Sequence, residues 1–488
     1  MERAINIFIG KRTLVLTILL SFLLVAMADD GIRMRSCRPM KMQRTEPVMR
    51  SAMRTTTENP YIGNRRQLVI MVSFANQDFL TDGETATLEK WNNIFNTVGY
   101  NQGDYVGSVH DYFYAQSYEQ LNLTFDLYYI PLSENREKYK STDEDDENSQ
   151  FLVNDIIDVL ATKGIDWSLY DWDGNGEVNQ LIIVYAGKGM NAGGGSNTIW
   201  PHQWWLSKHK NCSARTVTSG AKSYKIDCYC CVQEEIKTSS IQSSFGTICH
   251  EYSHCFGLPD FYVGSTKYVA EWDLMDYGNN NGKGFHPCGY SAHERMLLGW
   301  LMPTELTTTT TITSLPPLSD EPQAYLIRND GYANEYYMVE NRQKTGWDAS
   351  LPGSGIVVFH IDYDKEVWDE GLPNEDSPRR YTIIPANNKN SSYYQSNWAY
   401  PYADNNSISN ESTPIDTVYH TNTDGRKYMN KPLTNLDVTG GIASFDYTNN
   451  TTAITEKRII GEPKILFDLG PIYIIRNEKG EIKKVMKH

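Results

Sequence analysis

The chain has 488 residues and a formal net charge of −15 at pH 7. A chain of this length exceeds what one compact core organises, so we expect two or three domains. Its acidity excludes nucleic acid as the expected partner, because like charge repels phosphates, and it fits a secreted, calcium-binding protein.

Residues 1–28 have the composition of an export signal. Lys11 and Arg12 supply the positive charge, 14–27 form an apolar run too short for a comfortable bilayer span, and Ala26-Met27-Ala28 matches the A-x-A cleavage pattern. An uncleaved membrane anchor is the alternative. No later stretch is long and apolar enough to span a bilayer, so we expect a secreted or cell-surface protein without a membrane span after signal removal.

Residues 29–64 are basic, rich in methionine and without periodicity, which indicates a pro-segment or a flexible leader. Cys37 lies in this segment. A thiolate there is able to plug a metal site and keep an enzyme latent; the alternative is an incidental cysteine.

Residues 65–303 read as one α/β domain. Apolar or alternating runs predict strands at 67–74, 121–130 and 180–186. Helical spacing predicts helices after Ser108 and from Ser149 to Gly164. With the β-rich half that follows, the fold class is α+β.

The segment Asp171 to Asn179 places oxygen-bearing side chains at alternate positions with a glycine at the sixth, like the front of an EF-hand loop. The twelfth position is Ile182, so the bidentate glutamate is missing. We expect a structural calcium on Asp171, Asp173, Asn175 and Glu177; the alternative is an Asx turn that needs no ion.

Residues 198–206 read as an edge strand on a cleft rim, where an extended peptide would bind by strand addition.

Seven cysteines lie in the 65–303 segment. In an exported protein they predict disulfides that brace the active-site region, with connectivity left open. They are Cys212, Cys228, Cys230, Cys231, Cys249, Cys255 and Cys288.

His250-Glu251-x-x-His254 is the motif around which the chain is organised. On a helix the two histidines lie one turn apart on one face, so both are able to bind one zinc ion. Glu251 is placed to act as general base toward a zinc-bound water. Gly257 ends the helix, and Asp260 falls six residues after His254, where metzincins carry their third ligand.

Downstream, Met275 is the candidate for a methionine turn beneath the metal, although core packing is the commoner use of methionine. Tyr277 is the candidate for stabilising the oxyanion of the tetrahedral intermediate or for binding the resting metal. Glu271 is the alternative third ligand, because other zincins use a more distant glutamate.

After residue 303 the composition changes. Strand-like runs separated by turn residues predict a β-sandwich-like domain at 304–450. The tail at 451–488 resembles a shortened C-terminal sorting signal of the type IX secretion system; the alternative is that it supplies closing strands of the sandwich.

The chain resembles the immune inhibitor A-type family of secreted bacterial metallopeptidases. This resemblance implies a metzincin-like zinc peptidase domain, built from a twisted mixed sheet with backing and active-site helices, often with structural calcium. It implies zinc binding by His250, His254 and Asp260, and catalysis by Glu251. We expect a zinc-dependent endopeptidase that hydrolyses extracellular proteins; the alternative is a surface binding or adhesion protein on a peptidase-like scaffold. The segments that carry the resemblance are 107–113, 171–176, 199–202, 250–260, the Met275 turn and 297–300.

Overall fold

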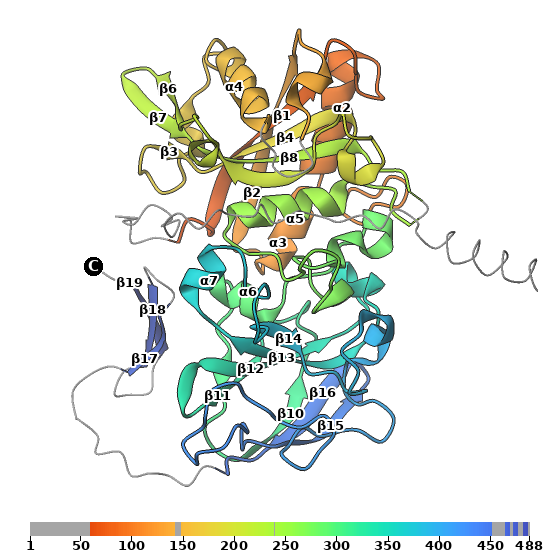
Figure 1. Ribbon diagram of the computed structural model, residues 1–488, viewed down its shortest axis with the longest axis vertical. Helices are drawn as coiled ribbons and strands as arrows, with labels where there is room; N and C mark the ends of the chain where they lie inside the picture. Colours follow the sequence, from red (N-terminus) through yellow and green to blue (C-terminus); the bar gives the residue numbers. More distant parts are fainter. Residues whose placement is uncertain are drawn as a thin grey trace, which may run out of the picture.

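The computed structural model describes residues 59–141, 148–238 and 240–450, and three short strands between 464 and 486. The expected export signal, the leader up to residue 58 and Cys37 lie outside the described residues. Strands and helices are mixed along the described chain, so the α+β class is confirmed (Figure 1).

A five-stranded sheet forms the upper layer in Figure 1, in the order β2-β1-β4-β8-β5. The first four strands run parallel, and β5 lies antiparallel to β8 at the edge, as predicted for the 198–206 segment. The strands are β1 (Gly63–Ser73), β2 (Leu121–Pro131), β4 (Leu181–Lys188), β5 (His202–Trp205) and β8 (Cys228–Glu235).

Both faces of this sheet are covered, so its central strands are continuously apolar. In β1, Val69 and Met71 face one core, while Leu68, Ile70 and Val72 face the other. On the first face lie α2 (Gly83–Asn96), α3 (Val109–Gln116) and α5 (Phe245–Cys255); on the second lies α4 (Ser149–Leu160).

The helix starts follow the local chemistry. Ser108 caps α3 as predicted, and together with Asp111 it forms a reciprocal capping box. The N-cap of α4 is Asn148 rather than Ser149. Helix α2 was not predicted, because its polar sequence buries only four side chains.

A small sheet beside the upper layer was also not predicted. It pairs the hairpin of β6 (Arg215–Ser219) and β7 (Lys222–Ile226) with β3 (Glu177–Val178).

The lower half contains two more sheets, in the orders β14-β13-β12-β11-β9 and β10-β16-β15. In β12, Met338 faces the core that includes α5, whereas Tyr337 and Val339 face the core shared with β15 and β16. One hydrophobic core therefore crosses the expected boundary at residue 303. The strands are β9 (Thr304–Glu305), β10 (Thr310–Leu315), β11 (Tyr325–Asn329), β12 (Tyr332–Arg342), β13 (Gly355–Asp362), β14 (Tyr381–Ile383), β15 (Leu433–Thr439) and β16 (Ile442–Tyr447), with helices α6 (Ala292–Leu297) and α7 (Lys365–Asp369).

The tail strands β17 (Lys464–Asp468), β18 (Ile472–Arg476) and β19 (Ile482–Met486) form an antiparallel sheet of their own. Among the described strands they pair only with each other, so they do not extend the β10-β16-β15 sheet. No helix in the described part of the chain is long and apolar enough to cross a membrane.

Disulfides were predicted, but none joins the seven described cysteines to one another. Five of them are buried, namely Cys230 and Cys231 in β8, Cys249 and Cys255 in α5, and Cys288. Burial raises the pKa of the Cys249 and Cys288 thiols well above its usual range, which keeps them protonated and unreactive.

Candidate metal centre

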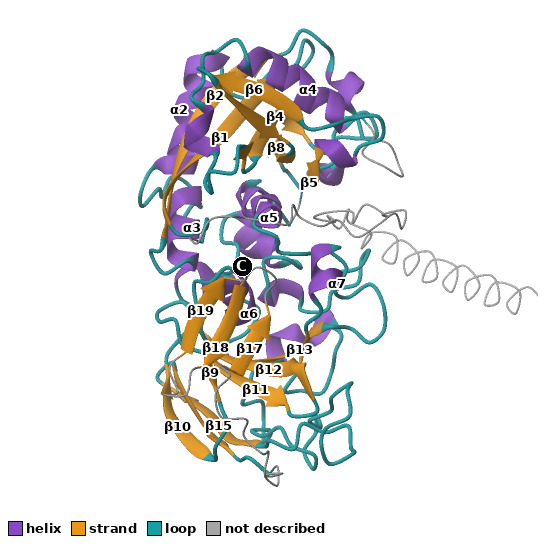
Figure 2. Ribbon diagram, turned by 90° about the vertical axis from the view of Figure 1, so that its left-hand side faces the viewer, coloured by secondary structure: helices purple, strands orange, loops and turns teal. Residues whose placement is uncertain are grey.

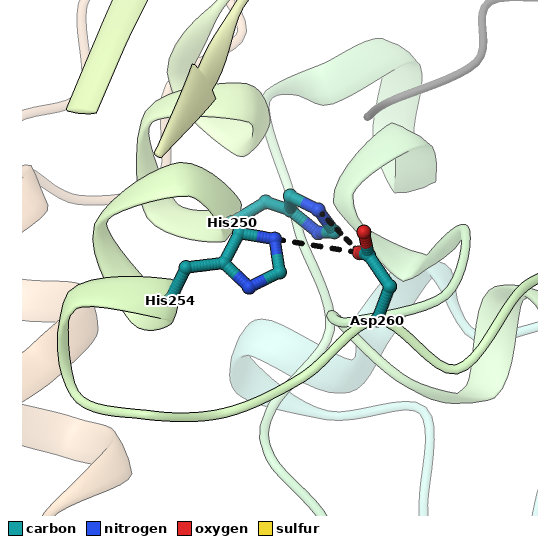
Figure 3. A group of neighbouring side chains, drawn as sticks. All are labelled: His250, His254 and Asp260. Atoms are coloured by element: carbon teal, nitrogen blue, oxygen red, sulfur yellow. Dashed lines mark ion pairs between the residues drawn. The ribbon is translucent and has the colours of Figure 1, made fainter. Parts of the chain in front are cut away.

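Helix α5 lies between the upper sheet and the lower half of the molecule, as both ribbon views show (Figures 1 and 2). His250 and His254 lie one turn apart on it, with ring centroids 4.8 Å apart. The helix ends at Cys255, and Gly257 then takes φ +94°, a left-handed conformation that glycine adopts without strain. This reversal returns the chain toward the two rings and brings Asp260 beside them (Figure 3).

The predicted triad meets in space. Asp260 Oδ1 lies 3.1 Å from His250 Nε2 and 3.4 Å from His254 Nε2. The three ligand atoms lie within 4.8 Å of one another, and among the described residues this is the only such group of three or more His, Cys, Asp or Glu side chains. Glu271, the alternative ligand, instead places its Oε1 2.9 Å from Lys267 Nζ.

Two backbone carbonyls orient the imidazoles. His250 Nδ1 lies 2.8 Å from the Leu274 carbonyl oxygen, and His254 Nδ1 lies 2.7 Å from that of Leu258. A ring that donates from Nδ1 keeps its lone pair on Nε2, the atom that faces Asp260 in both rings.

The donor set fits a zinc ion. Two imidazole nitrogens and one carboxylate oxygen are ligands that zinc commonly takes in catalytic sites. His250 Nε2 and Asp260 Oδ1 are buried and make no regular hydrogen bond, although they approach to 3.1 Å. Two acceptor atoms held face to face in this way require a cation or a shared proton.

The second imidazole, His254, favours its protonated form. Burial opposes charge on His254, but the Asp260 carboxylate outweighs it and raises the pKa of His254 to about 9. Burial would likewise raise the pKa of Asp260, yet the two histidines hold it well below its usual range. A metal ion that binds at neutral pH therefore has to displace a proton.

Glu251 is fully buried on α5, and its charge adds to the rise in the pKa of His254, one of the predicted ligands. Met275 is also fully buried, and its carbonyl accepts a hydrogen bond of 2.9 Å from the amide of Phe261, the residue after Asp260. The turn at Met275 is thereby tied to the segment that carries Asp260, the predicted third ligand.

Tyr277 is buried and lies beside another tyrosine ring. Its ring packs edge-on against Tyr262 at 5.7 Å, and the Lys267 ammonium lies 3.9 Å from its centroid. Tyr262 in turn lies 6.5 Å from the ring of His250. Sequence reasoning missed Tyr262; its position two residues after Asp260 was the available signal.

The predicted calcium loop is organised by backbone contacts. The Asp171 carboxylate accepts from the amides of Asn175 and Gly176, and Asn175 Oδ1 accepts from the amide of Glu177. Asp173 is buried. Burial raises the pKa of Asp171, and the nearby Asp173 charge adds to the rise. The three hydrogen bonds from backbone amides to Asp171 and Asn175 are the contacts of an Asx turn. A calcium ion here stays a prediction.

Comparison with known proteins confirms the resemblance stated above. The family described as the catalytic domain of immune inhibitor A peptidase M6 matches residues 76–300, which include the whole triad. Immune inhibitor A of Bacillus thuringiensis subsp. alesti is 29% identical over an alignment of 170 residues, and the match covers 30% of this chain and 24% of that protein. The chain thus matches about a quarter of this relative's length. These matches support a metallopeptidase.

Proposed function

Because residues 76–300 match the catalytic domain of immune inhibitor A peptidases, we propose that this chain is an exported zinc-dependent endopeptidase acting on extracellular proteins. The observation that carries the proposal is the buried convergence of His250, His254 and Asp260 on one point. In this proposal the chain consists of a peptidase domain at 65–303, a β-sandwich-like domain at 304–450 and a tail at 451–488 that serves as a sorting signal.

The site residues divide the chemistry among them. His250, His254 and Asp260 would hold a zinc ion, which when bound would polarise the scissile carbonyl and acidify a water molecule. Glu251 would take a proton from the attacking water and pass it to the leaving amine. Tyr277, steadied by the neighbouring aromatic ring and ammonium group, stabilises the oxyanion.

The upper sheet supports a metzincin-like fold. Its four parallel strands are followed at one edge of the sheet by an antiparallel strand, β5, which packs beside α5. An extended substrate would bind by adding a strand to the free edge of β5. Met275 would form the floor of the metal site.

Calcium at Asp171, Asp173, Asn175 and Glu177 would be structural. The charge of Asp173 adds to the rise in the pKa of Asp171, and a bound cation would relieve that repulsion.

Two measurements on the processed protein test the proposal. We expect about one zinc ion per chain and hydrolysis of casein or gelatin that a zinc chelator abolishes. A surface adhesion protein on a peptidase-like scaffold is the competing function. A zinc-loaded, processed chain that cleaves none of a broad panel of proteins would favour it.

A further inference from the structure

The metal centre is framed by two segments, the chain just after Asp260 and the turn through Met275. Both segments contact buried residues of the lower half, Asn374 and Tyr381. These contacts join positions 113 and 108 residues apart in the sequence, and both contributing residues lie beyond the matched range 76–300.

Tyr381, at the start of β14, touches both segments. Its hydroxyl donates to Asp273 Oδ2 at 2.9 Å, while Asp273 Oδ1 accepts from the amide of Met275 at 2.8 Å. Its ring stacks on Phe261 at a centroid distance of 3.7 Å and an interplanar angle of 18°. Because Tyr381 is fully buried, a water molecule cannot replace its hydroxyl as a hydrogen-bond donor to Asp273 Oδ2.

Asn374 completes the attachment of Phe261. Its Nδ2 donates to the carbonyls of Phe261 and Tyr381, each at 2.8 Å, and its Oδ1 accepts from the amide of Tyr381. The amide of Phe261 meanwhile donates to the Met275 carbonyl. The amide, the carbonyl and the ring of Phe261 therefore each have a partner, and these contacts fix the position of Asp260 immediately before it.

The same turn orients the first histidine. Leu274, between Asp273 and Met275, offers its carbonyl to His250 Nδ1 at 2.8 Å. A shift of the turn would rotate this imidazole, because the hydrogen bond on Nδ1 sets the direction of Nε2.

We propose that Asn374 and Tyr381 are positioning residues of the metal centre, supplied by the lower half of the chain. The inference rests on the proposed function. The metal affinity of the 65–303 segment therefore depends on residues outside that segment, although neither residue touches the metal or the substrate.

The test compares two tyrosine variants of the full processed chain. Tyr381→Phe keeps the stacked ring and removes the hydroxyl. Tyr337→Phe is the matched control, because Tyr337 is equally buried and its hydroxyl donates at 2.7 Å to the Thr417 carbonyl, away from the metal centre. Zinc affinity is measured by competition with a chelator, the ligand field by the visible spectrum after cobalt substitution, and stability by the thermal midpoint.

We expect Tyr381→Phe to weaken zinc binding by about 10-fold to 100-fold and to alter the cobalt spectrum. Tyr337→Phe should lower the thermal midpoint to a similar degree but keep wild-type affinity and spectrum. Asn374→Ala is the second variant, and it should weaken zinc binding in the same range.

The outcomes separate the two claims. If the wild-type protein takes up no zinc, or if His254→Ala takes up as much, the proposed function is wrong and this inference falls with it. If the wild type binds zinc through His254 while Tyr381→Phe and Asn374→Ala keep its affinity and spectrum, the metal centre stands and the positioning role is overturned.

Discussion

Arg342 is a fully buried cation at the junction of the two halves, and replacing it is the sharpest test of how they are joined. Its Nε and Nη2 each lie 2.8 Å from the Asp348 carboxylate, and its Nη1 lies 3.1 Å from Glu340 Oε1. It also donates to the carbonyls of Trp272 at 3.3 Å and Gly289 at 3.0 Å. Arg342→Met keeps most of the side-chain volume and removes every one of these donors.

The expected cost follows from what remains. Asp348 and Glu340 would be left as buried carboxylates without their cation, and breaking a buried ion pair from one side costs about 3–5 kcal/mol. The orphaned carbonyls add to this cost, although such contributions do not sum. We therefore expect Arg342→Met to lower the free energy of unfolding by roughly 4 kcal/mol in urea denaturation at pH 7.

Arg66→Met is the matched control. Arg66 also makes a two-point contact with one aspartate, Asp126, but its side chain is 46% exposed. Exposed pairs contribute about 1 kcal/mol or less, so this variant should lose little stability. Equal losses for Arg342→Met and Arg66→Met, or a loss below about 1 kcal/mol for the former, would refute the reasoning.

Three further predictions concern metal ions. Asp260→Asn should lose most bound zinc by elemental analysis while Glu271→Gln keeps it; the reverse pattern would identify Glu271 as the third ligand. Below pH 6.5 the proton held by His254 stabilises the ion-free fold fully, and this stability is lost as pH rises through about 9. The zinc-induced rise in thermal midpoint, measured with buffered zinc, should therefore grow from pH 6.5 to 9 and not stay flat. Calcium should raise the thermal midpoint of the wild type but not of Asp171→Ala; an identical response in both would remove the calcium site.

The triad was predictable because its geometry is local. An i, i+4 pair on a helix fixes His250 and His254 on one face, and Gly257 permits the reversal that returns Asp260. Strands β1 and β4 were predictable for a related reason, since burial on both faces demands continuous apolar runs, whereas β8 was not predicted.

The supports of the site were not predictable from the sequence. Tyr381 and Asn374 reach it only through the packing of sheets more than 100 residues downstream, which no periodicity encodes. The cysteine prediction was wrong for the same reason. Cys249 and Cys288 pack as small apolar side chains in the core, and sequence proximity to the motif says nothing about which sulfurs meet.

The most direct test of the central claim is casein hydrolysis by the processed Glu251→Ala variant, with its zinc content measured on the same sample. The predicted result is a zinc content equal to that of the wild type and a loss of at least about 100-fold in the rate of cleavage, because only the proton acceptor is removed. Cleavage at the wild-type rate by a zinc-loaded Glu251→Ala protein would contradict the assignment of this residue as the base and, with it, the mechanism proposed for the site.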